Sequence, residues 1–124
     1  MLTKTEFSLK LDEDLEDLRG IKGRCFSDEE YQKRWQKVIT YLEDTKLDSL
    51  IIYGAERAGS AIPWLTGWPV SAEALLIISL DSEAKLFVQY YNHTPQAKST
   101  AYGASVSWGG PNTAQTMLTH LNQI

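Results

Sequence analysis

The most regular hydrophobic pattern of the chain lies between residues 27 and 46. Apolar side chains follow one another there at spacings of four, three, one and three residues, which places them on one face of an α-helix. They are Tyr31, Trp35, Val38, Ile39 and Leu42. Ser27 and Glu30, three residues apart, form a capping box, so the helix is expected to begin at this serine.

Apolar runs after this helix predict four strands. Residues 50–53 are a continuous β-favouring run closed by Gly54, which suits a strand covered on both faces. Residues 74–80 and 85–91 form two further runs separated by a short polar turn, so they must pair as an antiparallel hairpin. Residues 104–108 form the last and shortest run.

Helices are expected between and after the last strands. Residues 93–101 suit a short helix with Pro95 in its first turn, and residues 111–124 suit a C-terminal helix. The expected buried positions of this last helix are Met117, Leu118 and Leu121. Helices and strands in this order indicate an α/β domain with a mixed sheet and helices packed against it.

The stretch IPWLTGWP, residues 62–69, is too short and too interrupted for a strand or a long helix. A helical turn is expected to begin near Ser60 and to end at Gly67, where a left-handed conformation costs glycine little. Trp64 is expected to pack in the core, and Trp68 is expected to be the more exposed tryptophan. The stretch is therefore interpreted as a structural corner rather than as a ligand site.

The length of 124 residues suits one domain, expected at residues 26–124, preceded by an N-terminal arm of residues 1–25. Cys25 is the single cysteine, so no internal disulfide can form and a reducing compartment is expected. The first residues lack the apolar core of a signal peptide, and no apolar run is long enough to span a membrane. We therefore expect a cytoplasmic protein with no membrane contact.

The net charge of −4 is unevenly distributed along the chain. Residues 1–83 hold all sixteen acidic residues, whereas residues 84–124 hold two lysines and no acid. No basic stripe is present, so nucleic acid is not an expected partner. The acid-free C-terminal third cannot supply carboxylates for catalysis or for metal binding.

Two local patterns resemble catalytic motifs only in part. Residues 54–60 place two glycines at the spacing of a phosphate loop, but Ser60 and Ala61 stand where that loop needs Lys and then Ser or Thr. A strand-to-helix turn is the better interpretation. Ser105 lacks the glycine two residues later that a nucleophile elbow requires. Neither pattern therefore predicts a reaction.

The remaining chemical candidates are single residues. His93 and His120 are the only histidines, and they lie far apart with no acid nearby in sequence, which disfavours a zinc site. His93 is expected near a strand end, where functional side chains gather, although a surface or capping role is the simpler interpretation. Cys25 precedes a helix, where a thiolate could be stabilised, but a small residue in a connector is favoured.

Several segments taken in order resemble the creatinase/prolidase N-terminal domain. Residues 26–54 are similar to its entry helix and first strand, with Arg34 on the helix and Leu47 and Asp48 leading into the strand. Its Leu-Thr-Gly turn is matched by residues 64–68. The segments ALLIIS, AKLFVQ and TPQAKSTA fit the elements that follow. The resemblance covers roughly residues 26–122, and its specificity comes from the order and spacing of the segments.

The resemblance implies a three-layer α/β domain, similar to ribonuclease H, with a mixed sheet of five or fewer strands flanked by helices. It also implies a non-catalytic domain of a Xaa-Pro aminopeptidase or dipeptidase. In that family a separate "pita-bread" domain uses two Asp, one His and two Glu to hold two divalent metal ions, which activate a water. No cofactor is therefore expected in this chain itself. The family domain usually continues with another strand and helix, so a truncated domain is expected.

The resemblance also implies partners and a contact region. In such enzymes this domain helps to form the homodimer and narrows access to the active site of the partner subunit. The expected contact residues follow the Leu-Thr-Gly turn or lie near a strand end: Trp68, Pro69, Val70, Ser71, Glu73 and His93. No basic residue follows Trp68 in this loop, unlike the arginine of creatinase, which favours a proline peptidase as the parent.

Two other functions remain open from the sequence. The chain could be a free-standing small α/β binding module without peptidase function. It could also be an enzyme in its own right, an interpretation that rests only on His93 and Glu73 near strand ends.

Overall fold

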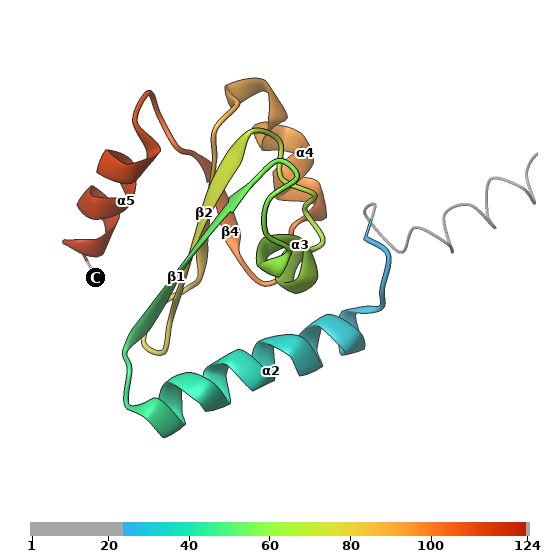
Figure 1. Cartoon of the computed structure of the whole chain (residues 1–124), viewed down its shortest axis with the longest axis vertical. Helices are drawn as coiled ribbons and strands as arrows, with labels where there is room; N and C mark the ends of the chain where they lie inside the picture. The colour runs from blue at the N-terminus through green and yellow to red at the C-terminus, as the bar shows by residue number, and fades with distance from the viewer. Residues whose placement is uncertain (1–23, 124) are drawn as a thin grey trace, which may run out of the picture.

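A single mixed sheet of four strands organises the molecule in the computed structural model, which describes residues 24–123 (Figure 1). β1 (Ser49–Ala55) and β2 (Glu73–Ser79) are antiparallel, β2 and β3 (Lys85–Val88) are antiparallel, and β3 and β4 (Ser105–Trp108) are parallel. The strands lie side by side in chain order. The predicted hairpin and the mixed sheet are confirmed. The predicted arm lies, up to residue 23, outside the described residues.

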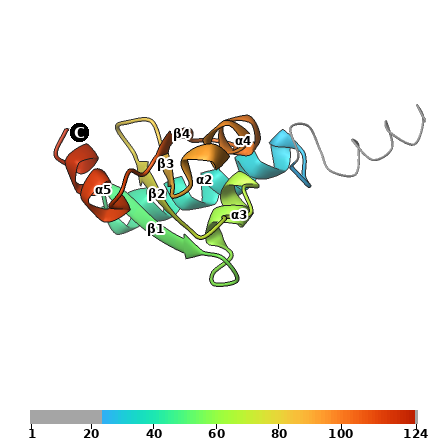
Figure 2. The same cartoon turned by 90° about the horizontal axis from the view of Figure 1, so that it is seen from above.

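Helices lie on both faces of this sheet. Figures 1 and 2 show α3 (Ala61–Thr66) and α4 (Thr94–Thr100) on one side and α5 (Thr113–Leu121) on the other. The long α2 (Asp28–Thr45) contributes Leu42 to the same core as α3 and α4. A 3₁₀ turn, η2 (Tyr91–His93), precedes α4. The predicted three-layer α/β architecture is confirmed.

The main core lies between the sheet and the helices α2, α3 and α4. Every second residue of a strand points to this face, so β2 contributes Ala74, Leu76 and Ile78. The helices contribute Leu42, Ile62, Leu65 and Ala97, and the neighbouring strands add Leu86, Val88 and Val106. β2 also buries Leu75 and Ile77 on its other face, and β3 buries Phe87 there, so the two central strands are covered on both sides.

The second face of the sheet is only partly covered. α5 lies over β2 and β3, where the rings of His120 and Phe87 pack edge to face with their centres 5.7 Å apart. It packs mainly on these two strands, and on β1 Ile51 remains 44% exposed and Tyr53 59% exposed. The prediction that the first strand is covered on both faces is therefore wrong. The prediction of burial is also wrong for Leu118, which is 49% exposed.

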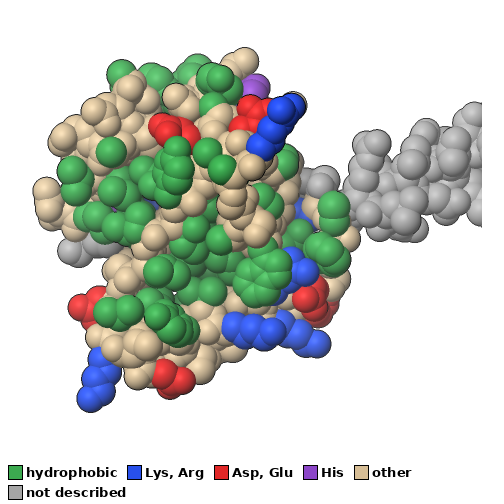
Figure 3. Space-filling model, viewed as in Figure 1, with side chains coloured by type: hydrophobic (Ala, Val, Ile, Leu, Met, Phe, Trp, Pro, Cys, Tyr) green, Lys and Arg blue, Asp and Glu red, His purple; other side chains and the backbone are tan. Residues whose placement is uncertain are grey.

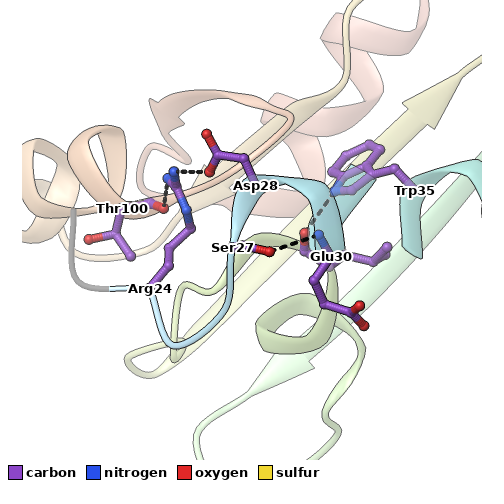
Figure 4. A network of polar contacts seen from close by, with 7 residues as sticks. Arg24, Ser27, Asp28, Glu30, Trp35 and Thr100 are labelled. Atoms are coloured by element: carbon purple, nitrogen blue, oxygen red, sulfur yellow. Dashed lines mark hydrogen bonds and ion pairs between the residues drawn. The ribbon is translucent and has the colours of Figure 1, made fainter. Parts of the chain in front are cut away.

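The start of α2 is held by the Ser27 N-cap, which is one half of the predicted capping box, and by an arginine that precedes it; the Glu30 carboxylate accepts from Arg34. The Ser27 hydroxyl accepts a hydrogen bond from the Glu30 amide at 3.2 Å, which confirms the cap (Figure 4). The buried Arg24 donates to the Thr100 carbonyl at 2.8 Å and to Asp28 at 2.9 Å. Because Thr100 is the last residue of α4, this arginine joins the beginning of one helix to the end of another.

A second arginine joins α2 to α3. Arg34 donates to the Trp64 carbonyl at 2.8 Å, and its guanidinium lies 5.0 Å from the centre of the Trp64 ring. At the next position of α2, the Trp35 indole N–H donates to the Leu65 carbonyl at 2.7 Å. Both bonds satisfy carbonyls at the end of a six-residue helix that lacks intrahelical donors for them. The pairing of α2 with α3 therefore holds the short helix in place.

The expected corner forms as predicted, but the burial of its two tryptophans is the reverse of the prediction. α3 follows Ser60 and ends at Gly67, whose φ of 78° is left-handed. Trp68 is 6% exposed and belongs to the core, whereas Trp64 is 39% exposed, so the assignment of the tryptophans is wrong. The left-handed turn redirects the chain toward the sheet, while Trp64 lies on the side of α3 that faces Arg34.

Gly67→Val is expected to destabilise the domain strongly. A Cβ at this position would lie 2.8 Å from Cγ of Arg24 and 2.9 Å from the Tyr31 hydroxyl, both buried. The left-handed backbone costs about 1–2 kcal/mol for a non-glycine residue, and overpacking adds about 1–3 kcal/mol. Thermal unfolding measures the effect.

Gly59→Val is the matched control. Gly59 is also left-handed, at φ 81°, but a Cβ there would meet no atom closer than 4.0 Å. Its unfolding temperature should fall by the backbone cost alone. An equal fall for the two variants, or no fall for Gly67→Val, would contradict the packing described for this corner.

Candidate functional site

Three segments meet at one end of the sheet, where β1 and β3 end and β2 begins. They are the turn that follows β1, the loop of residues 68–72 that leads into β2, and η2. The Glu56 amide donates to the Ala72 carbonyl at 2.8 Å, which joins the first two. Ser71 and His93 join the second to the third. We call residues 68–73 together with His93 the contact segment.

The Ser71–His93 pair is the closest polar contact of the contact segment. The Ser71 hydroxyl lies 2.6 Å from Nδ1 of His93, and both residues are half-buried. The edge of the His93 ring also meets the Tyr90 ring, with the two centres 5.1 Å apart. Because the hydroxyl engages Nδ1, the other ring nitrogen, Nε2, remains for a further partner. The histidine is thus held in orientation from two sides.

A second polar pair lies at the same end of the sheet. The Tyr53 hydroxyl donates to Oε2 of Glu73 at 3.0 Å, across the β1–β2 pairing. The hydrogen bond to this carboxylate raises the pKa of Tyr53 above its usual value, and desolvation and the negative charge add to the shift. Glu73 therefore keeps an acceptor at the surface, with its position fixed by the phenol.

The loop itself is held in an unusual conformation. Val70 and Ala72 have positive φ values of 53° and 62°, which are rare for residues other than glycine. Such backbone persists only where the surroundings hold it in place. Here the Val70 side chain is buried in the core, and the Ala72 carbonyl accepts the bond from Glu56. The contact segment is therefore anchored to the rest of the fold at Val70 and Ala72.

The six predicted contact residues divide into two groups. Trp68 and Val70 are buried in the core, so their side chains are not available to a partner, and the expected exposure of Trp68 is wrong. Both turn inward because the chain must close the core between α3 and β2. The other four are exposed or half-buried and stay predicted contacts: Pro69, Ser71, Glu73 and His93.

Aromatic residues beside His93 form a feature that the sequence reasoning missed. The run 85–91 is predicted as one strand, but β3 ends at Val88 and η2 follows. Tyr91 is exposed, and its ring packs edge to face with the Trp108 ring, with the two ring centres 5.4 Å apart. The Trp108 indole donates to the Gln89 carbonyl at 2.7 Å. The doublet of tyrosines after an apolar strand is the signal that could have indicated this surface.

The other candidate residues lie apart from this end of the sheet. His120 lies on α5 and packs on Phe87, Ser105 begins β4, and Cys25 is exposed before α2. Within residues 24–123, no three side chains of His, Cys, Asp or Glu gather closely enough to hold a metal ion. None of the helices described is both long and apolar enough to cross a membrane.

Comparisons with known proteins place this arrangement in a family. The family model of the Creatinase/Prolidase N-terminal domain matches residues 34–124. A solved structure of aminopeptidase P, a Xaa-Pro aminopeptidase from Streptococcus thermophilus, superposes with a TM-score of 0.61 at 17% identity, over 75% of this chain and 66% of that chain. No curated protein sequence matches the chain.

Two further structures are similar. The creatinase/prolidase-like N-terminal domain of a candidate metallopeptidase from Corynebacterium diphtheriae has a TM-score of 0.58 at 19% identity, over 72% of this chain and 66% of its own. A proline dipeptidase from Streptococcus pneumoniae has a TM-score of 0.57 at 28% identity, over 72% of this chain and 65% of that chain. The chain thus spans just under two thirds of the length of each structure, and the shared feature is the fold.

Glu73→Ala is expected to lower the pKa of Tyr53 toward that of an ordinary tyrosine. The variant removes both the hydrogen bond and the negative charge that favour the protonated phenol. Glu73→Gln keeps an acceptor without the charge, so it should lower the pKa less. The bond is present below the pKa of Tyr53 and is lost as the pH rises through it.

Titration of the Tyr53 ring signal by NMR measures these values, and Tyr53→Phe assigns the signal. An unchanged pKa in Glu73→Ala would show that the two side chains do not interact in solution.

Proposed function

Since the chain belongs to the family of creatinase/prolidase N-terminal domains, we propose that it is the non-catalytic N-terminal domain of a Xaa-Pro aminopeptidase or dipeptidase. The observation that carries the proposal is the family match over residues 34–124. Similarity to structures of an aminopeptidase P and a proline dipeptidase supports it. In this proposal the hydrolytic reaction belongs to a catalytic domain outside the 124 residues.

The metal ions of the reaction belong to that catalytic domain. Two divalent ions would be held there by carboxylates and a histidine, and they would activate a water for attack on the bond before proline. The acid-free residues 84–124 support this division, because they offer no carboxylate ligand. The single cysteine, Cys25, supports a cytoplasmic location for the whole protein.

The proposed task of this domain is to form a homodimer and to limit access to the active site of the partner subunit. The exposed part of the contact segment suits that task because it is rigid. Val70 is anchored in the core, and Ser71 holds the ring of His93. A rigid wall beside an active site limits the length and shape of the peptides that enter it. His93 and Glu73 would supply the polar contacts to a bound peptide.

His93→Ala in the full-length protein is expected to weaken peptide binding. Loss of one hydrogen bond corresponds to about a three- to tenfold rise in KM for a Xaa-Pro peptide. The kcat and the metal content should change little, because this residue is proposed to contact the peptide and not the metal ions. Lys98→Ala is the matched control, since Lys98 is exposed on α4 and should leave KM unchanged.

The experiment begins with the complete reading frame that contains these residues. Steady-state kinetics on Xaa-Pro peptides with added divalent metal then tests the proposal. A full-length protein without peptidase activity would contradict the peptidase role and favour the free-standing binding module. Activity with equal KM values in His93→Ala and the native protein would contradict only the contact through His93.

A further inference from the structure

Ser71 lies between two residues whose backbone is left-handed. The φ values of Val70 and Ala72 are 53° and 62°, and strained backbone of this kind gathers at functional sites in proteins. The buried side chain of Val70 fixes the loop before Ser71, and the bond from the Glu56 amide to the Ala72 carbonyl fixes it after Ser71. The Ser71 hydroxyl is therefore presented from a turn that is held on both sides.

The Ser71 hydroxyl also has a base within hydrogen-bond distance. Its oxygen lies 2.6 Å from Nδ1 of His93. In the neutral tautomer of His93 that carries the ring proton on Nε2, Nδ1 accepts the hydrogen bond from the hydroxyl. A serine hydroxyl is a weak nucleophile until an adjacent base takes its proton, and this pair has the required distance.

Two backbone amides beside the hydroxyl are free for a developing negative charge. The amides of Ser71 and Ala72 donate to no backbone acceptor among residues 24–123. In serine acyl transfer, the amide of the nucleophile or that of the next residue helps to hold the oxyanion. Both residues are only half-buried, so the carbonyl group of a small ester can reach them.

An exposed aromatic surface adjoins the pair. The Tyr90 ring packs edge to face with the His93 ring, and Tyr91 packs in the same way with Trp108. All three aromatic side chains are exposed. Figure 3 shows hydrophobic side chains at the surface of the upper end of the molecule, where the chain enters α4 in Figure 1. Such a surface suits an ester with an apolar or aromatic group.

We propose that Ser71 is a nucleophile, activated by His93, that accepts an acyl group from an ester. The Ser71 oxygen forms a bond to the ester carbonyl carbon, and the hydroxyl proton passes to Nδ1 of His93. The bond from that carbon to the leaving oxygen then breaks, and this oxygen takes the proton from His93. An acyl-serine and a free alcohol or phenol result, with no change of oxidation state. The inference goes beyond the proposed function and does not depend on it.

The pair lacks the acid that orients the histidine in a catalytic triad. No carboxylate among residues 24–123 bonds to His93, whose ring is held by Ser71 and Tyr90. Replacement of the orienting acid lowers the rate of a serine protease by about 10⁴-fold. Esters with good leaving groups are therefore the expected acyl donors, and peptide bonds are not. This reactivity is thus compatible with a domain that does not cleave peptides.

The test uses p-nitrophenyl acetate on the native 124-residue chain, with a chelator present to exclude ester cleavage by bound metal. A burst of p-nitrophenol should appear, and peptide mass spectrometry should locate the acetyl group on Ser71. Ser71→Ala should abolish the burst. His93→Ala should slow the acetylation of Ser71 by about a hundredfold or more, which is the usual contribution of a general base.

Ser82→Ala is the matched control. Ser82 is half-buried like Ser71, but it lies in the turn between β2 and β3, away from the contact segment. Its loss should leave the burst unchanged. Equal unfolding temperatures of the variants and the native chain confirm that a lost burst does not reflect a lost fold.

Ser71→Cys in a Cys25→Ser background gives a second, independent measurement. A thiol beside a histidine forms a thiolate at neutral pH, so iodoacetamide should alkylate it about tenfold faster than the exposed Cys25 of the native chain. The additional change His93→Ala should remove this advantage.

Acetylation that spares Ser71, or that proceeds equally fast in His93→Ala, would overturn the inference. A cysteine at this position that reacts no faster than Cys25 would overturn it as well. Each of these results would leave the proposed function untouched, because that function is measured separately by the peptidase assay of the full-length protein.

Discussion

The left-handed turn at Gly67 is the constraint on which the position of the contact segment depends. Its backbone ends α3 and sends Trp68 into the core. Arg24 and Tyr31 pack so closely against it that no side chain fits there. The loop of residues 68–72 therefore begins against the core, and the buried side chain of Val70 anchors it there. The position of Ser71, and through it that of His93, follows from this single turn.

The helices around this turn are joined by arginines rather than by apolar contacts alone. Arg24 binds the last carbonyl of α4, and Arg34 binds a carbonyl of α3. Both side chains are buried, and each also has an acidic partner four residues away in the sequence, Asp28 for Arg24 and Glu30 for Arg34. Arginine suits this role because its planar group can donate several hydrogen bonds while it lies against aromatic rings. The three helices on the main face therefore act as one layer.

The two faces of the sheet are covered to different extents. The main face is filled and rigid, and it supports the contact segment at one end. The second face carries only α5 among the described helices, and Ile51 and Tyr53 of β1, the end strand of the described sheet, have exposed side chains there. The described residues therefore have a core of their own, as expected of the creatinase/prolidase N-terminal domain that they match.

The elements of the fold could be predicted from the sequence because their signals are local. The capping box at Ser27, the period of the apolar residues on α2 and the hairpin of β2 and β3 depend only on neighbouring residues. The order of short segments around the Leu-Thr-Gly turn also sufficed to indicate the family. Of the predicted contact residues, four remain at or near the surface, and Ser71 and His93 are bonded to each other.

The tertiary structure alone decided which apolar residues are covered. Trp64 and Trp68 are chemically equivalent in the sequence, and only the direction of the chain after Gly67 separates the core tryptophan from the exposed one. The apolar run of β1 looks like a buried strand, but its place at the end of the strand order and the position of α5 over β2 and β3 leave Ile51 and Tyr53 exposed. Local sequence specifies hydrogen-bonding and periodicity within an element. Burial depends on what a distant segment covers, and that is settled only when the whole chain has packed.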